Sequence, residues 1–524
     1  MPRTLKELSQ VDRTAITKID RPWVPRKYEV EISYSLEEAI REGLLNSLAV
    51  RSSDLDRTIQ ERELIVAHSV FDPFFNLATN YAKNRQPTVS TIQGSTAGIS
   101  VAPSKIFDYS AGFTGTWITG SQYQISVGQV RSDVPAQQTA GFTTLNPVVS
   151  TQLLIEVQQP LLKGAWYSVN TADIRIAENN TLLASKELEL TAINTIFQIE
   201  QAYWDLVFAT QNLEAKLNTF RVSLENLENV RKRKAVGTLA AIHVTTAESQ
   251  AALRRVELDE ARQLQENNRD AFLNVINYAN QKSLKQHWQG GPSGGTYENV
   301  RVICTTDPVS EAEMADRDAA LGLAFNDRPE YRQIELNLQN QQIRIEVARN
   351  ALLPSLDVTA GWAQSGLDEH FGDSWDSVGS GDFYDWQVGL QFSIPLGNRG
   401  PRNSYRNSRD ELRKIRLSKV DLENQIVIEV DQAIRTIEYL TETVKDLDER
   451  VRLQTALLAA EVRKVDVGMS IAYTVSVIAN DLVDNQTQAL RARTNLQIAI
   501  ADYYRATGRL LQRYNVGYDF SRDR

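Results

Sequence analysis

The 524-residue chain is predicted to have a mainly helical α+β fold with an internal duplication. Three observations predict it. The stretch 201–276 is repeated, without a gap, at 432–507. Long stretches with helical periodicity contain neither proline nor glycine, and shorter stretches alternate apolar and polar residues with the period of a β-strand. The duplication indicates that the two halves form equivalent parts of one symmetric object.

The repeat appears when the chain is shifted by 231 residues. This shift places Gln201-Ala202 on Gln432-Ala433 and Val236-Gly237 on Val467-Gly468. A unit of this length is not a short solenoid repeat of the kind that stacks in arrays. The predicted parts are an N-terminal extension (1–33), a first repeat (34–280), an irregular connector (281–316), a second repeat (317–512) and a C-terminal tail (513–524).

Four prolines mark predicted switches between helix and strand. Pro73 and Pro354 each follow a helical stretch and precede an extended one. Proline has no N–H to donate and pushes the preceding residue out of the helical region, so it favours this switch. The strands that follow are predicted to end at Pro160 and Pro395, after which long helices begin.

Four amphipathic strands are predicted, at 113–127 and 149–158 in the first repeat and at 356–363 and 384–394 in the second. Each would present one apolar and one polar face. Four strands cannot close a barrel, and an open sheet edge cannot lie in lipid, because its N–H and C=O groups would lack partners. Two interpretations therefore stay open. Either several chains pool their strands in a membrane, or the strands form a soluble sandwich beside the helices.

The stretch 171–236 predicts one helix, because neither proline nor glycine interrupts it. At 1.5 Å per residue this helix would be about 100 Å long. Its apolar seam follows heptad spacing with one stutter, as in a coiled coil. The seam consists of Ile199, Ala202, Leu206, Ala209, Leu213, Leu217, Phe220, Leu224 and Leu227. The long helices end at Gly237 and Gly468, which we expect to form hairpin tips, each followed by a helical stretch of equal length.

The composition excludes several classes of function. A formal net charge of -9 without a basic stripe argues against a nucleic-acid partner. The single cysteine, Cys304, excludes an internal disulfide and a multi-cysteine metal site, and the four histidines lack ligand spacing. The sequence shows neither a nucleophile motif nor a phosphate-binding loop. We therefore predict a protein that is not an enzyme and holds no cofactor or metal.

Membrane and export signals are weak in the sequence. No stretch approaches the roughly 20 apolar residues of a membrane-spanning helix, although amphipathic strands would escape such a search. The first 18 residues contain basic residues but no apolar core, so no signal peptide is visible.

Several motifs, in order and in both halves, resemble the outer membrane efflux protein family, the TolC-like channel-tunnels. Asn326-Asp327-Arg328-Pro329-Glu330 and the stretch 348–356 (ARNALLPSL) look like its helix-to-strand signature. The stretches 159–164 (QPLLKG) and 394–400 (IPLGNRG) look like its strand-exit signature, and Val236-Gly237 and Val467-Gly468 match its hairpin tips. The resemblance covers roughly 34–512.

The resemblance implies a homotrimer with a twelve-stranded transmembrane β-barrel, four strands from each chain, above an α-helical barrel. Such a protein lies in the cell outer membrane, contacts its lipid and extends into the periplasm. It is the exit duct of a tripartite efflux system or of type I secretion. Its partners are a periplasmic adaptor, also called a membrane fusion protein, and an inner-membrane pump. The alternatives are a periplasmic adaptor and a structural coiled-coil protein without a pore.

The resemblance also directs attention to the residues beyond each tip. In the family, acidic side chains after the second tip glycine narrow the periplasmic end, but Thr474 and Val477 occupy those positions here. His243 stands at the analogous place in the first repeat. Asp481 and Asp484, one to two turns further on, are candidates for a constriction or for a solvated helix face. Gly237 and Gly468 are expected to contact the adaptor; the alternative is a helix cap without a partner.

Overall fold

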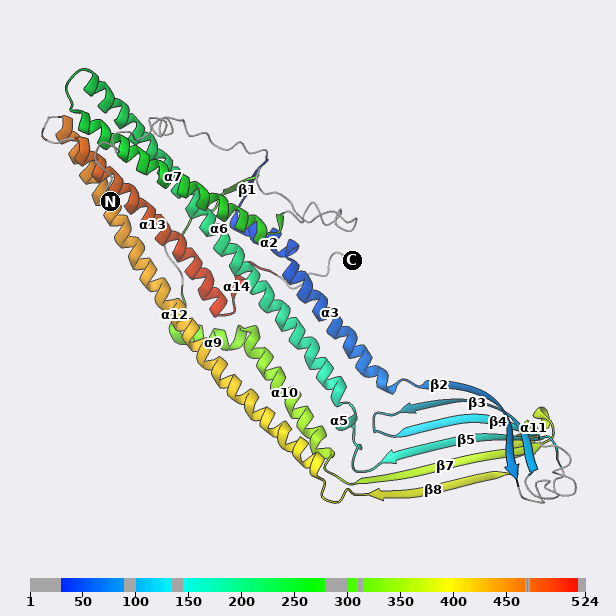
Figure 1. Ribbon diagram of the computed structural model, residues 1–524. Helices are drawn as coiled ribbons and strands as arrows, with labels where there is room; N and C mark the ends of the chain where they lie inside the picture. Colours follow the sequence, from blue (N-terminus) through cyan, green and yellow to red (C-terminus); the bar gives the residue numbers. More distant parts are fainter. Residues whose placement is uncertain are drawn as a thin grey trace, which may run out of the picture. The chain divides into compact units, whose positions relative to one another are not determined.

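The structure, a computed structural model, describes residues 30–88, 100–133, 145–278, 300–309, 314–466, 469 and 472–516 (Figure 1). Its helices are α2 (Leu36–Asn46), α3 (Leu48–His68), η2 (Ser69–Phe71), α5 (Tyr167–Asn170), α6 (Ala172–Ala235), α7 (Ala241–Val275), α9 (Arg317–Asp327), α10 (Pro329–Asn350), α11 (Phe371–Ser380), α12 (Arg399–Asp466), α13 (Ala472–Ala506) and α14 (Leu510–Arg513). Its strands are β1 (Val30–Tyr34), β2 (Phe74–Thr88), β3 (Ser100–Thr116), β4 (Gln122–Asp133), β5 (Val148–Pro160), β6 (Val300–Cys304), β7 (Ser355–Asp368) and β8 (Tyr384–Ser393).

The chain divides into two compact units. The first holds the described residues of 1–56, 185–332 and 420–524, and the second holds those of 57–184 and 333–419. The unit boundaries fall within α3, α10, α6 and α12. The predicted division into consecutive repeats therefore follows the order of the chain, whereas each compact unit takes segments from both repeats.

Two helical hairpins make up most of the first unit, with α7 beside α6 and α13 beside α12 (Figure 1). Five seam residues, Ile199, Leu206, Ala209, Phe220 and Leu227, are buried, as the heptad pattern predicts. The expectation of equally long returning helices is wrong. Helix α7 has 35 residues against 64 in α6, and α13 has 35 against 68 in α12. The returning helices stop early because a residue with positive φ ends each of them, Asn277 at 52° and Gly508 at 74°.

A small parallel sheet lies in the same unit. Strand β1 pairs with β6, with Val30 opposite Val300 and Tyr34 opposite Cys304. The connector 281–316 is therefore not irregular throughout, and strand β1 begins at Val30, within the stretch predicted as the N-terminal extension. The alternating apolar residues of these short strands pack on the core formed with α2, α6 and α7.

The second unit contains a six-stranded antiparallel sheet in the order β2-β3-β4-β5-β7-β8. The predicted four strands per chain are therefore too few. The stretch 113–127, interpreted as one strand, crosses a turn between β3 and β4, in which the Trp117 N–H donates to the Ser121 carbonyl at 2.7 Å. Strand β2 begins where an extended stretch was expected after Pro73, but it was not among the four predicted strands. Its alternation of Phe75, Leu77 and Tyr81 against Asn76 and Asn80 fades into the charged stretch from Lys83 onward.

The register places residues of like polarity side by side across all six strands. One line across the sheet joins Phe75, Phe113, Ile125, Ile155, Trp362 and Trp386. The adjacent line on the opposite face joins Phe74, Thr114, Gln124, Glu156, Gly361 and Gln387. The sheet thus has an apolar face and a mainly polar face. None of the helices in the described part of the chain combines the length and the hydropathy of a membrane-spanning helix.

Candidate functional site

The sequence motifs at the ends of the strands meet in the second unit. Asn350, the last residue of α10, accepts from the Gly164 N–H at 2.7 Å and donates to the Leu162 carbonyl at 3.1 Å. Asn398 donates to the Leu352 carbonyl at 3.0 Å. These amides pair backbone groups that a helix end or a turn leaves without a partner. The motifs therefore form one hydrogen-bonded junction between helices and sheet.

The four prolines lie at this junction. Pro73 separates η2 from β2, and Pro354 immediately precedes β7. Pro160 is the last residue of β5, and Pro395 follows β8 by two residues. Positive φ angles at Gly164 (80°) and Gly397 (94°) turn the chain after Pro160 and Pro395, respectively.

The first hairpin tip is a Schellman motif centred on Gly237, whose φ is 79°. The Gly237 N–H donates to the Lys234 carbonyl at 3.0 Å, and the Thr238 N–H donates to that of Arg233 at 3.0 Å. A Cβ at Gly237 would meet no atom within 4 Å. Two apolar side chains at the tip are exposed, Val236 by 74% and Ile242 by 66%.

The second predicted tip, Val467-Gly468, lies outside the described residues. Beside it, the Met469 N–H donates to the Lys464 carbonyl at 2.8 Å. At the 231-residue shift this bond corresponds to the one between Thr238 and Arg233. Met469 is also exposed, so each tip presents an apolar side chain.

The residues considered for a constriction lie on two helices. His243 is exposed in the first turn of α7, while Thr474, Val477, Asp481 and Asp484 lie on α13 at spacings of three and four, which places them on one face. Asp484 is paired with Lys216 of α6 at 3.2 Å, and Lys216 also contacts Glu257 of α7 at 3.2 Å. Asp484 thereby links the second hairpin to the first.

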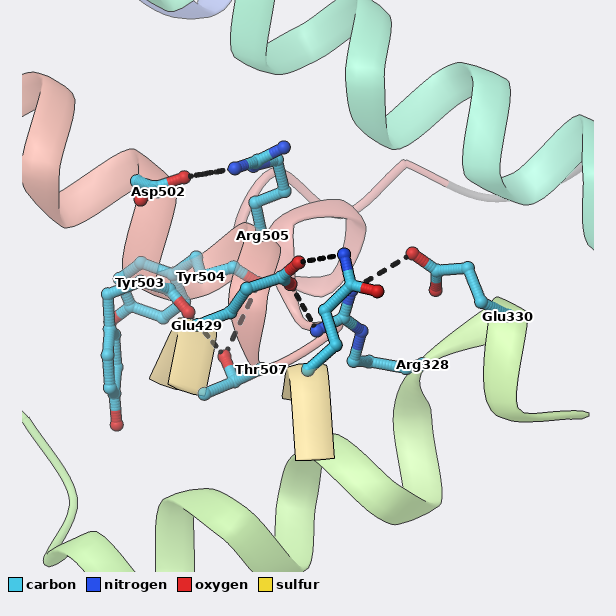
Figure 2. A network of polar contacts seen from close by, with 9 residues as sticks. Arg328, Glu330, Glu429, Asp502, Tyr503, Tyr504, Arg505 and Thr507 are labelled. Atoms are coloured by element: carbon cyan, nitrogen blue, oxygen red, sulfur yellow. Dashed lines mark hydrogen bonds and ion pairs between the residues drawn. The ribbon is translucent and has the colours of Figure 1, made fainter. Parts of the chain in front are cut away.

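A buried ion pair, which the sequence did not single out as such, holds the start of α10 (Figure 2). Arg328 is 8% exposed, and its guanidinium donates to Glu429 at 2.7 Å and to Glu330 at 3.1 Å. Burial alone would lower the pKa of Arg328, but the two carboxylates outweigh it and raise that pKa. Arg328 and Glu330 belong to the motif at 326–330, so this part of the motif has a structural role.

The same motif packs against the end of α13. A Cβ at Gly508 would lie 2.8 Å from the Arg328 backbone nitrogen and 2.8 Å from the Asp327 carbonyl carbon. Glycine at this position therefore satisfies both the positive φ and the close approach of two backbones.

Glu200 is a second buried charge in the first unit. Its side chain on α6 is 1% exposed, and burial raises its pKa to about 7 despite the attraction of Arg513. At the 231-residue shift it corresponds to Asp431, whose carboxylate accepts from Arg317 at 2.7 Å. The two repeats thus place carboxylates of opposite pKa shift at equivalent positions.

The structure brings together one group of possible metal ligands that the sequence did not indicate. Asp368, His370 and Asp373, at the start of α11, have ligand atoms within 4.8 Å of one another. Their spacing in the sequence is the only signal that could have found them. All three side chains are at least partly exposed, as is common for acidic groups on a protein surface.

Comparison with known proteins gives two findings. Residues 320–509 match the model of the outer membrane efflux protein family. A membrane protein from Pseudomonas aeruginosa shares the fold at a TM-score of 0.64, with 15% identity over 90% of each chain. The CmeC outer membrane channel of Campylobacter jejuni has a TM-score of 0.62 and 13% identity, over 91% of this chain and 86% of that one.

The open-state MtrE outer membrane channel of Neisseria gonorrhoeae also has a TM-score of 0.62, with 16% identity over 94% of this chain and 96% of that one. A search of curated proteins finds no match. The fold over nearly the whole chain is thus that of outer-membrane channels. The match of residues 320–509 to the model of the outer membrane efflux protein family agrees with this fold over most of the second repeat.

Proposed function

We propose that the protein is the exit duct of a tripartite efflux or type I secretion system, seated in the outer membrane and extending into the periplasm. The observation that carries this proposal is the sheet with an apolar band across all six strands on one face and a mainly polar face opposite. Farther from the junction, the face with the band carries Gln129 and Thr151, which are hydrogen-bonded to Ser374 under α11. Together with paired helical hairpins, such a sheet suits a wall between lipid and water. A periplasmic adaptor or a coiled-coil protein without a pore would have no use for an apolar face of this width.

Several copies are needed to complete such a duct. Strand β2 pairs only with β3, and β8 only with β7, within the part of the chain that the structure describes. In lipid these two edges require partners, because no water is present to satisfy their backbone groups. We infer that three copies assemble, as the channel-tunnel fold implies, and that a periplasmic adaptor and an inner-membrane pump complete the system.

The two hairpin tips are the proposed contacts for the adaptor. Val236 and Ile242 are apolar and exposed beside Gly237, and Met469 is exposed beside Gly468. Exposed apolar side chains at the end of a helical hairpin fit an apolar groove on a partner. The face with Thr474, Val477, Asp481 and Asp484 is the proposed lining near the second tip; with its two carboxylates beyond the tip, it differs from the acidic pair expected of the family.

The duct proposal is tested by removing the gene from its bacterium and measuring export of dyes, drugs and secreted proteins. We expect loss of export, restored by the wild-type chain, and we expect the protein in the outer-membrane fraction as a heat-modifiable trimer. A soluble monomer with export unaffected would contradict the proposal.

The tip proposal is tested separately with Val236→Glu and Ile242→Glu. A charge within an apolar contact should weaken adaptor binding about tenfold or more. Val236→Leu is the matched control, since it keeps the apolar surface. Trimer yield is measured for each variant, and normal export by correctly assembled glutamate variants would remove this tip from the docking surface.

A further inference from the structure

The sheet contains one more hairpin than four strands per chain would require. Strands β3 and β4 lie between β2 and β5 in the sheet. Along most of its length β3 pairs with both neighbours, with β2 from Ser100 to Thr114 and with β4 from Lys105 to Thr116. The β3–β4 hairpin is therefore a continuous part of the sheet. Removing it would separate β2 from β5, so the sheet cannot be described as four strands plus an appended hairpin.

The extra hairpin has the same two faces as the rest of the sheet. On the apolar face, β3 presents Phe107, Tyr109, Ala111 and Phe113, and the preceding strand presents Phe75, Leu77 and Tyr81. Strand β4 adds Ile125 and Val127 to this face, and its outer residues Gln129 and Arg131 contact α11 there. On the other face, Asn76 donates to Thr114 at 3.0 Å and Asn80 donates to Asp108 at 3.1 Å. This alternation is the pattern of strands with lipid on one side and water on the other.

The turn of the extra hairpin is anchored at the junction with the helices. The Gly120 N–H donates to the Trp117 carbonyl at 2.8 Å, and the Ser121 hydroxyl is hydrogen-bonded to Gln159. A Cβ at Gly120 would overlap the Gly164 carbonyl oxygen, so the turn lies directly against the strand-exit loop. The hairpin thus spans the full height of the sheet, from this short turn outward.

The two open edges are complementary. The chain runs away from the helix-to-strand junction in β2 and returns toward it in β8, so β2 of one copy and β8 of the next would pair in antiparallel fashion. With an even number of strands per chain, every neighbour in a closed ring is antiparallel. Both edge strands also carry their apolar residues on the same face of the sheet.

We propose that all six strands of each chain form part of the transmembrane barrel, and that a second copy of this chain pairs with each open edge, β2 and β8. Three copies then close eighteen strands rather than twelve. With strands about 4.8 Å apart and tilted by about 40°, the ring is about 36 Å across, against about 24 Å for twelve strands. The membrane pore is therefore about 1.5-fold wider, because barrel diameter grows roughly in proportion to strand number. This inference rests on the proposed function.

The direct test is electron cryomicroscopy of the full-length protein in lipid nanodiscs, which counts chains and strands. Three chains and eighteen strands are expected. Three chains with twelve strands, or two chains with twelve, would overturn the inference. Export is measured on the same protein: a twelve-stranded trimer that still exports refutes only the strand number, whereas loss of the trimer and of export refutes the duct.

Cysteine cross-linking tests the edges in cells. In a Cys304→Ser background, Ala78→Cys or Asn80→Cys on β2 is combined with Asp385→Cys, Gln387→Cys or Gln391→Cys on β8, all on the polar face. Oxidation should link each chain to its neighbours for at least one pair. The matched control uses Gln124→Cys on β4, which lies three strands from β8 in the same chain and should give no link. Links from β4 to β8 without links from β2 would show closure on four strands and overturn the proposal.

Discussion

The first repeat contributes four strands to the sheet, β2 to β5, and the second contributes two, β7 and β8. The helices show no such difference. Helices α2 and α3, with 11 and 21 residues, correspond to α9 and α10, with 11 and 22. Because a hairpin leaves the sheet at the same end at which it enters, one can be added without changing the helices on either side. The comparison teaches that strand number can change in steps of two while the helical framework stays duplicated.

The repeats also differ at the contact where the shorter helices pack on the long ones. In the first repeat, a Cβ at Gly43 would overlap the Ile199 side chain and lie 3.5 Å from Ile276. When α2 is aligned with α9, Gly43 corresponds to Ala324. At the 231-residue shift, Ile199 corresponds to Val430 and Ile276 to Thr507, and all three residues of the second repeat are buried. The larger residue on one helix is matched by a smaller one on its neighbour in both cases. The two repeats can thus keep the same spacing between these helices, because the change in side-chain volume on one helix is offset on its neighbour.

The largest effect is expected at the residues that end the returning helices. Gly508→Ala should destabilise the protein by about 4 kcal/mol or more, because positive φ and a close backbone contact both oppose a Cβ. Asn277→Ala, the equivalent in the first repeat, adds no atom against a neighbouring backbone and should cost about 1–2 kcal/mol, the penalty for alanine at positive φ. Urea unfolding followed by circular dichroism measures both. Equal losses would show that the second helix end is not more tightly packed than the first.

A smaller effect is expected at the start of α10. Arg328→Met leaves Glu429 and Glu330 without their buried cation and should cost about 3 kcal/mol. The equivalent residue in the first repeat is Ser47, whose hydroxyl accepts from the Val50 N–H at 3.3 Å. Ser47→Ala should therefore cost only about 1 kcal/mol, as the loss of a helix cap does. The same unfolding measurement applies, and a loss at Ser47 as large as that at Arg328 would contradict the assigned role of the ion pair.

The carboxylates at equivalent positions should respond to pH in opposite ways. Burial raises the pKa of Glu200 to about 7, so its neutral form is favoured in the folded state and stability falls as pH rises from about 4.5 to about 7. Glu200→Gln should remove this decline, which amounts to about 3 kcal/mol. The Arg317 hydrogen bond lowers the pKa of Asp431, so Asp431→Asn should instead remove a loss of stability on the acidic side.

Unfolding midpoints measured from about pH 2 to about pH 8 distinguish these two variants, because Asp431 titrates below its ordinary range and Glu200 above it. A Glu200→Gln protein that loses stability over the same range as the wild type would mean that another group titrates there. Identical profiles for the two variants would remove the predicted difference between the repeats.

The smallest effect is expected where the volumes compensate. Gly43→Ala should cost about 1–2 kcal/mol, because its Cβ displaces the flexible end of Ile199. The double variant with Ile199→Val reproduces the pair found in the second repeat and should recover most of that loss. A double-mutant cycle measures the coupling. Additive losses would show that the first repeat adapts by moving its helices.

Sequence patterns predicted most of the helical framework but not the whole sheet. The tip at Gly237 and the four proline positions follow from local backbone chemistry, which a sequence displays directly. Strands β2 and β3 carry a visible alternation, yet polar residues near their far ends and a turn at 117–121 obscured it. Pairing register depends on neighbours far away in the sequence, so no local pattern could place Phe75 beside Phe113.

The sequence by itself determined the duplication, the long heptad helices, the tip at Gly237 and the switch from helix to strand. Each of these depends on periodicity or on a residue with restricted φ, and both are local properties. Only the tertiary structure decided that Arg328 pairs with Glu429, that Gly508 faces Asp327 and that six strands share one apolar face. Such contacts join residues tens to hundreds of positions apart, and their energies depend on burial and distance, which arise only when the chain is folded.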